Sequence, residues 1–184
     1  MEKIFAQDGV FFHATLPLIW RTKSGPTDDE ITVWMYDNVT LLRALATIEA
    51  FQPENEVDTA TGTGKTLQHL EFKIDLTLNL IAKLLTQSII LPHAHPVFLS
   101  ADGMEWICGE PPPTQGEDIL ISTFISPKLP QPLVLPAKVA AVRKEEGGTR
   151  IYATFTHLNE EARDWLSRTV FRYHRRAIHT QHHE

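Results

Sequence analysis

The sequence predicts an α+β protein, a small antiparallel β-barrel closed by a C-terminal helix and carrying a long helical arm. Three observations predict this fold. Short apolar runs separated by turn residues follow Pro92, a strongly apolar helix precedes them, and one amphipathic helix ends the chain. Because a closed barrel removes exposed strand edges, it is favoured over a sandwich, and the absence of regular strand–helix alternation argues against βαβ units.

The predicted strands are short and end at loops rich in proline, glycine or charge. The first of these predicted loops is Ser24–Glu30. An N-terminal aromatic and β-branched run, which Pro17 could bend, supplies one strand, and four runs after Pro92 supply the others. The predicted strands are Val10–Trp20, Val97–Ser100, Ile119–Ile125, Leu133–Val142 and Arg150–Thr156.

Two helices are predicted beside the barrel. Apolar residues recur at three and four positions over Val39–Phe51, and Asn38 is the candidate N-cap. The last helix, Asn159–Ile178, begins with an N-cap candidate and two acids and ends in cations, the order that the helix dipole favours.

A third predicted helix, Leu67–Ser88, is apolar around most of its circumference, so it needs cover on two sides. In so small a chain, one side of this helix is expected to pack on its own chain and the other side on another copy, in a coiled-coil-like bundle. The alternative is a fully buried central helix in a monomer. The expected interface residues are Leu67, Leu70, Phe72, Ile74, Leu76, Leu78, Leu80, Ile81, Leu84 and Leu85.

Composition limits the partners. The chain has 184 residues and a formal net charge of −6, which argues against nucleic acid or an anionic lipid surface as a partner. No apolar stretch reaches the length of a membrane span or of a signal-peptide core, and Cys108 is the single cysteine. We therefore expect a reduced, cytoplasmic protein in which Cys108 packs rather than reacts.

One short motif points to a family. In Phe98-Leu-Ser100-Ala-Asp-Gly103, a serine and a glycine have the spacing of the nucleotide-contacting turn of PilZ domains, which are small β-barrels that bind cyclic di-GMP. The segment Phe155–Leu166 resembles the family's passage from the last strand into the final helix. The C-terminal half of the chain therefore resembles a PilZ domain.

The sequence lacks the charged residues with which PilZ domains bind their ligand. PilZ domains place two arginines four residues apart before the first strand and an acidic or amide residue two before the serine. Here Arg21 is the only arginine in that approach, Pro17 and Gly25 stand four residues to either side of it, and Phe98 replaces the acid. Ser100 and Gly103 are then expected to be a remnant turn that does not bind.

PilZ proteins with a long heptad-bearing helix and no arginine pair form tetramers, so the resemblance implies this motif-lacking branch. Residues 1–90 are expected to supply the N-terminal strand and the oligomerisation arm, with helical structure from about 38 to 90, and residues 91–184 the barrel and last helix. The implied role is that of a non-enzymatic adaptor in bacterial signalling, such as type IV pilus motility, biofilm or virulence. Its expected partners are other copies of itself and a signalling or pilus-assembly protein.

Two other functions are weighed against the adaptor. In the first, the protein binds cyclic di-GMP through arginines of the last helix, Arg168, Arg172 and Arg176, with Arg175 as a further candidate, from a neighbouring subunit; a solvated helix face is the simpler interpretation. The second is nucleotide hydrolysis, because Thr59–Thr66 resembles a phosphate-binding loop. Thr59 stands where that loop needs glycine, and no buried strand is predicted before it.

Histidines offer no complete metal site. His93 and His95 alternate on an extended segment and could chelate weakly, but no acid or cysteine of matching spacing completes a site. The remaining candidates, His174, His179, His182 and His183, belong to the end of the chain. No metal, no resident cofactor and no catalytic residue are therefore expected.

Overall fold

The structure is a computed structural model. It describes residues 10–50, 90–109, 111–127 and 129–181, together with residues 66, 67, 69, 70, 72–74, 76, 77, 80 and 81.

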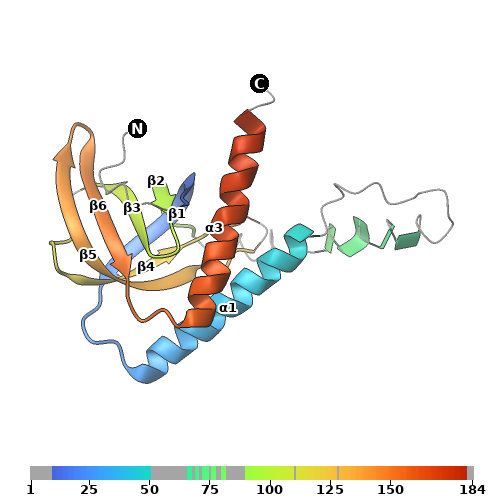
Figure 1. Cartoon of the computed structure of the whole chain (residues 1–184), viewed down its shortest axis with the longest axis horizontal. Coiled ribbons are helices and arrows are strands. Elements are labelled where there is room, and N and C mark those ends of the chain that lie inside the picture. The colour runs from blue at the N-terminus through green and yellow to red at the C-terminus, as the bar shows by residue number, and fades with distance from the viewer. Residues whose placement is uncertain are drawn as a thin grey trace.

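Six antiparallel strands close into a barrel, in the order β1-β2-β3-β6-β5-β4 (Figure 1). The N-terminal strand pairs with β2 and with β4, so it closes the barrel of its own chain. Two helices complete the body, and the predicted α+β barrel with a C-terminal helix is confirmed. The elements are β1 (Phe12–Thr22), α1 (Asp28–Ala50), β2 (Ala94–Leu99), β3 (Gly103–Cys108), β4 (Asp118–Thr123), β5 (Leu133–Glu145), β6 (Gly148–Phe155) and α3 (Glu160–Gln181).

One strand of the barrel was not predicted. β3 contains alternating inward and outward residues, but it follows β2 after a turn of only three residues and carries Glu105 at its centre. The prediction placed the turn glycine, Gly103, behind a strand, whereas Gly103 is the first residue of β3. A charged residue at an outward position hid the strand signal.

The start of α1 was also predicted wrongly. The helix begins at Asp28, within a segment whose composition predicted a loop. Its first turn is held by a capping box: the Glu30 backbone N–H donates to Thr27 Oγ1 (3.2 Å) and the Thr27 N–H donates to Glu30 Oε2 (2.9 Å). Asn38 is therefore an interior helix residue and not an N-cap.

Asn38 instead joins α1 to the barrel. Its side-chain N–H donates to the Val134 carbonyl (2.6 Å) and its Oδ1 accepts from the Val134 N–H (2.9 Å). The pairing of β5 with β6 begins only at Ala137, so β6 offers no backbone partner to Val134. The side-chain amide of Asn38 supplies these hydrogen bonds instead. The segment 38–50 consequently belongs to the body and not to the arm.

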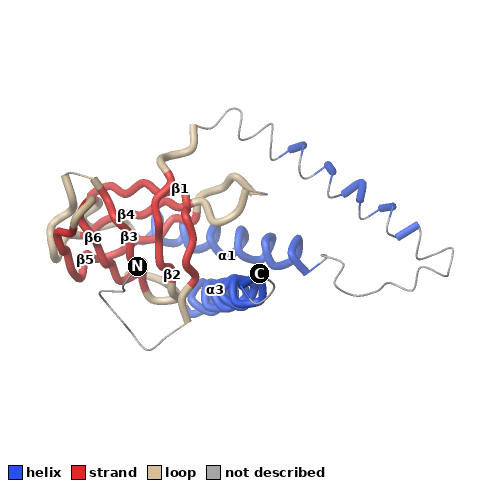
Figure 2. The backbone as a smooth tube through the Cα atoms, turned by 90° about the horizontal axis from the view of Figure 1, so that it is seen from above, coloured by secondary structure: helices blue, strands red, loops and turns tan. Residues whose placement is uncertain are grey.

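Both helices pack on the barrel core. Leu41, Leu42 and Leu45 of α1 and Leu166 and Val170 of α3 join the cluster formed by the inward side chains of the strands. Figure 2 shows α1 and α3 next to each other at one side of the barrel. The predicted N-cap of α3 is confirmed, because the Ala162 N–H donates to Asn159 Oδ1 (2.8 Å).

The described residues between 66 and 81 are helical, in agreement with the predicted third helix. Figures 1 and 2 show them away from the barrel, beyond the C-terminal end of α1. We call these residues the arm. The rest of the predicted third helix, including Leu78, Leu84 and Leu85, lies outside the described residues.

Candidate functional site

The turn between β2 and β3 is closed by its own serine. Ser100 Oγ accepts the backbone N–H groups of Asp102 (3.2 Å) and Gly103 (3.0 Å) and donates to the Gly103 carbonyl (3.0 Å). The Ser100 N–H also donates to the Gly103 carbonyl (2.9 Å). The hydroxyl group thus hydrogen-bonds within the turn, and its residue is only 9% exposed.

Gly103 is required by close packing. A Cβ atom at this position would lie 2.6 Å from the Ala153 carbonyl oxygen and 3.2 Å from the Tyr152 ring. Backbone does not yield as a flexible side chain does, so the neighbouring strand β6 explains this glycine. The next contact fixes the turn further, because Asp102 forms an ion pair with Arg163 of α3.

Phe98 lies on the outer face of the barrel, since its neighbours Val97 and Leu99 point into the core. It is 8% exposed and stacks on the His13 ring, with 4.5 Å between ring centroids and 23° between planes. Its cross-strand partners are His13 on β1 and Glu105 on β3. An aromatic ring therefore fills the position where PilZ domains hold an acid or amide.

A buried ion cluster next to Phe98 escaped the sequence analysis. Arg150 Nη1 donates to Glu105 (2.8 Å), and its Nε and Nη2 donate to the two oxygens of Glu145 (2.9 and 2.8 Å). The side chains of Arg150 and Glu105 are each 5% exposed. The hydrogen bond from Arg150 lowers the pKa of Glu145, while burial and then the charges of Asp102 and Glu105 raise the pKa of Tyr152, which pairs with Glu105. If β3 had been predicted, the opposite charges of Glu105 and Arg150 at outward positions of two paired strands would have indicated this ion pair.

Arg21, the only arginine of the N-terminal approach, is an exposed residue inside β1. It does not precede the first strand, and residues 1–11 contain no arginine. Pro17 is also in β1, whereas Gly25 is in the following loop with a φ of 58°.

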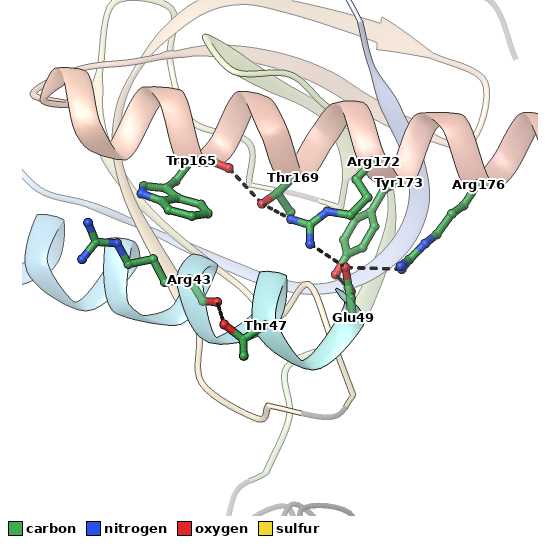
Figure 3. Close-up of polar contacts among 8 residues, drawn as sticks. All are labelled: Arg43, Thr47, Glu49, Trp165, Thr169, Arg172, Tyr173 and Arg176. Carbon is green, nitrogen blue, oxygen red and sulfur yellow. Dashed lines mark hydrogen bonds and ion pairs between the residues drawn. The ribbon is translucent and has the colours of Figure 1, made fainter. Parts of the chain in front are cut away.

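Three of the four candidate arginines of α3, Arg168, Arg172 and Arg176, are paired with acids of the same chain. Arg175, the fourth, is exposed. Arg168 forms an ion pair with Asp164 (2.9 Å) and lies over the Trp165 ring. Arg172 and Arg176 each place Nη1 3.3 Å from Glu49 Oε2 at the end of α1 (Figure 3). Tyr173 Oη donates to Glu49 Oε1 (2.7 Å); burial, and then this bond, raise the pKa of the Tyr173 hydroxyl.

The arm exposes the apolar side chains that were predicted to form an interface. Each of the described ones is between 47% and 64% exposed in the single chain. They are Leu67, Leu70, Phe72, Ile74, Leu76, Leu80 and Ile81.

The remaining motifs can be placed only in part. Of the Thr59–Thr66 loop, only Thr66 is among the described residues. The rings of His93 and His95 lie 5.5 Å apart, and no group of three or more His, Cys, Asp or Glu in the described chain could hold a metal. The Nδ1 atom of His174 lies 2.7 Å from the Phe11 carbonyl; His182 and His183, like the side chain of His179, lie outside the described part. Cys108 is buried in the barrel core, and this burial raises the pKa of its thiol.

Among the described helices, none is both long and apolar enough to cross a membrane.

The six-stranded barrel with its C-terminal helix agrees with the family to which the sequence is similar. The family model described as "Atypical PilZ domain, cyclic di-GMP receptor" matches residues 42–183. The chain therefore belongs to the atypical PilZ domain family. None of the curated proteins matches it.

A solved structure from Xanthomonas campestris is similar over nearly the whole chain. It is described as a pathogenic protein with a new tetrameric PilZ domain self-assembled via an unusual helical bundle. The sequences are 27% identical, the match covers 95% of this chain and 92% of the other, and the TM-score is 0.76. The predicted PilZ resemblance is thus confirmed.

Proposed function

We propose that this chain is a self-assembling adaptor in cyclic di-GMP-related bacterial signalling that binds little or no cyclic di-GMP itself. The observation that carries the proposal is the exposure of the arm, whose described apolar side chains are 47–64% exposed. Covering a side chain of this size by half contributes about 1 kcal/mol, so a row of them favours association. The tetramer named for the Xanthomonas campestris relative supports a homotetramer.

The turn between β2 and β3 and the outer face of the barrel support the proposal that the chain binds cyclic di-GMP weakly or not at all. Ser100 and Gly103 serve the turn, and Phe98 with His13 replaces a polar ligand contact by a stacked pair. Since the phosphates of cyclic di-GMP require cations, the absence of arginine from residues 1–11 removes the usual donors. The proposed role is a cytoplasmic, non-enzymatic one, exerted through contacts with a signalling or pilus-assembly protein in type IV pilus motility, biofilm formation or virulence.

Assembly is tested by light scattering of the full chain and of the double variant L76D/L80D. The wild type is expected to be a tetramer and the variant a monomer with an unchanged far-UV circular dichroism spectrum. The matched control is I19D, because Ile19 is 57% exposed on the barrel and lies outside the arm. A double variant that keeps the wild-type mass would exclude the arm as the interface.

A second candidate function is direct binding of cyclic di-GMP through Arg168, Arg172 and Arg176. The family description as a receptor favours it, and so does the convergence of Arg172 and Arg176 on one anionic group. Calorimetry separates the two functions. Sub-micromolar binding by the wild type that R168A and R172A weaken supports the receptor, and no heat of binding supports the adaptor.

A further inference from the structure

Glu49 occupies an unfavourable position for a carboxylate. It lies in the last turn of α1, which contains no basic residue, next to the negative end of the helix dipole. Its side chain is only 8% exposed. A buried charge at such a place requires compensation from outside its own helix.

The compensation comes from one face of α3, as Figure 3 shows. Tyr173 donates to one carboxylate oxygen at 2.7 Å, and the guanidinium groups of Arg172 and Arg176 approach the other at 3.3 Å. That second oxygen is buried and accepts no well-aligned hydrogen bond. Two cations thus face one carboxylate whose hydrogen-bonding capacity is only half used.

Contacts other than Glu49 position these donors. Arg172 Nη2 donates to Thr169 Oγ1 (3.4 Å), and Thr169 donates to the Trp165 carbonyl (2.9 Å). The Tyr173 ring packs against Phe12 of β1, with ring centroids 4.8 Å apart. The cluster therefore has supports that do not depend on the carboxylate.

Two guanidinium groups that face one oxygen of a carboxylate, and a hydroxyl group that donates to the other oxygen, form a donor set that also suits a phosphate. The arginine side chains are 26% and 43% exposed, whereas Glu49 is nearly buried, so an anion from solvent meets the arginines first. We propose that Arg172, Tyr173 and Arg176 form a phosphate-binding site that Glu49 occupies from within the same chain. A phosphate-bearing ligand and Glu49 then compete for the same donors, and ligand binding would release the end of α1 from α3.

The test is calorimetry on the full chain with two probes, pyrophosphate and cyclic di-GMP. E49Q removes the competing charge but keeps an acceptor for Tyr173, so pyrophosphate affinity is expected to rise about tenfold or more above the wild type. The matched control is E161Q, since Glu161 pairs with Arg43 (2.5 Å) in the same contact between α1 and α3. E161Q is expected to bind like the wild type, and E49Q/R172Q is expected to lose the gain.

Thermal unfolding first establishes that each variant is folded. E49D is a second variant, which moves the carboxylate away from the arginines but keeps its charge, and its pyrophosphate affinity is expected to lie between those of the wild type and E49Q. If E49Q and E49D bind pyrophosphate no more tightly than E161Q, the site does not exist. If cyclic di-GMP binds E49Q more tightly than pyrophosphate does, the site exists and its ligand is a dinucleotide. Preference for pyrophosphate supports the same site with a free phosphate compound as ligand. The site lies within one chain, so its failure would leave self-assembly through the arm untouched.

Discussion

The barrel and the arm differ in how far their outward side chains are exposed to solvent. On the outer face of β2, β3 and β6, Phe98, Glu105, Arg150 and Tyr152 are each less than a tenth exposed, although they point away from the core. In the arm, the described apolar side chains are about half exposed. The outward groups of the barrel face contact one another within the chain, whereas the described apolar side chains of the arm stay exposed in the single chain.

Breaking the ion cluster on the barrel face should have the largest effect. R150M leaves Glu105 buried without its cation, which is expected to lower the free energy of unfolding by about 3–5 kcal/mol. The measurement is chemical denaturation followed by circular dichroism. The control is R143M, since Arg143 pairs with Arg150 across β5 and β6 but is exposed. Equal loss in both variants would mean that burial of the cluster contributes nothing.

Removing the link between α1 and β5 should have the next largest effect. N38A leaves the N–H and carbonyl groups of Val134 without their side-chain partner, with an expected loss of about 2–3 kcal/mol. Denaturation of N38A is compared with that of T47A, whose hydroxyl bonds on the exposed side of the same helix. The prediction fails if T47A is destabilised as much as N38A.

The serine of the turn should matter less, because the backbone bond from Ser100 to Gly103 remains without the hydroxyl. S100A is expected to lose about 1–2 kcal/mol of stability. Calorimetry with cyclic di-GMP should give the same result for S100A and wild type. A ligand affinity that falls with S100A, but not with S122A on β4, would assign the hydroxyl a role in binding.

Acid pH should have the mildest effect, through exposed or partly exposed carboxylates. The pKa of Glu145 is lowered by Arg150, and that of Glu117 by the Thr22 hydroxyl group. A carboxylate whose pKa is lower when folded stabilises the protein above its unfolded pKa, and this contribution disappears as the pH falls through the folded value. The melting temperature should therefore decline below about pH 4.5, and less steeply in E145Q. An identical pH profile for E145Q would remove Glu145 from this effect.

The sequence predicted the elements whose pattern is local. The Asn159 cap of α3, the N-terminal strand and the apolar positions of the arm can be derived from neighbouring residues. The start of α1 was lost because Thr27 and Glu30 were part of a segment with the composition of a loop, although their capping-box spacing was present. Asn38 was misjudged because its partner, Val134, is 96 residues away.

The sequence predicted that the candidate site lacks the charged groups that bind the ligand. The structure shows in addition what the residues at these positions contact. The sequence indicated that Phe98 replaces an acid, but its stacking on His13 depends on the pairing of β1 with β2. The pairing of Arg172 and Arg176 with Glu49 joins residues more than 120 positions apart, so the spacing of the arginines alone could not reveal it. Long-range pairing thus accounts for most of what the sequence analysis missed.

Assembly through the arm is tested most directly by the mass of the full chain in solution, measured by light scattering at micromolar concentrations. We expect a particle of four times the chain mass of 20.9 kDa. A particle of 20.9 kDa at every concentration would show that the apolar surface of the arm does not join copies of this chain.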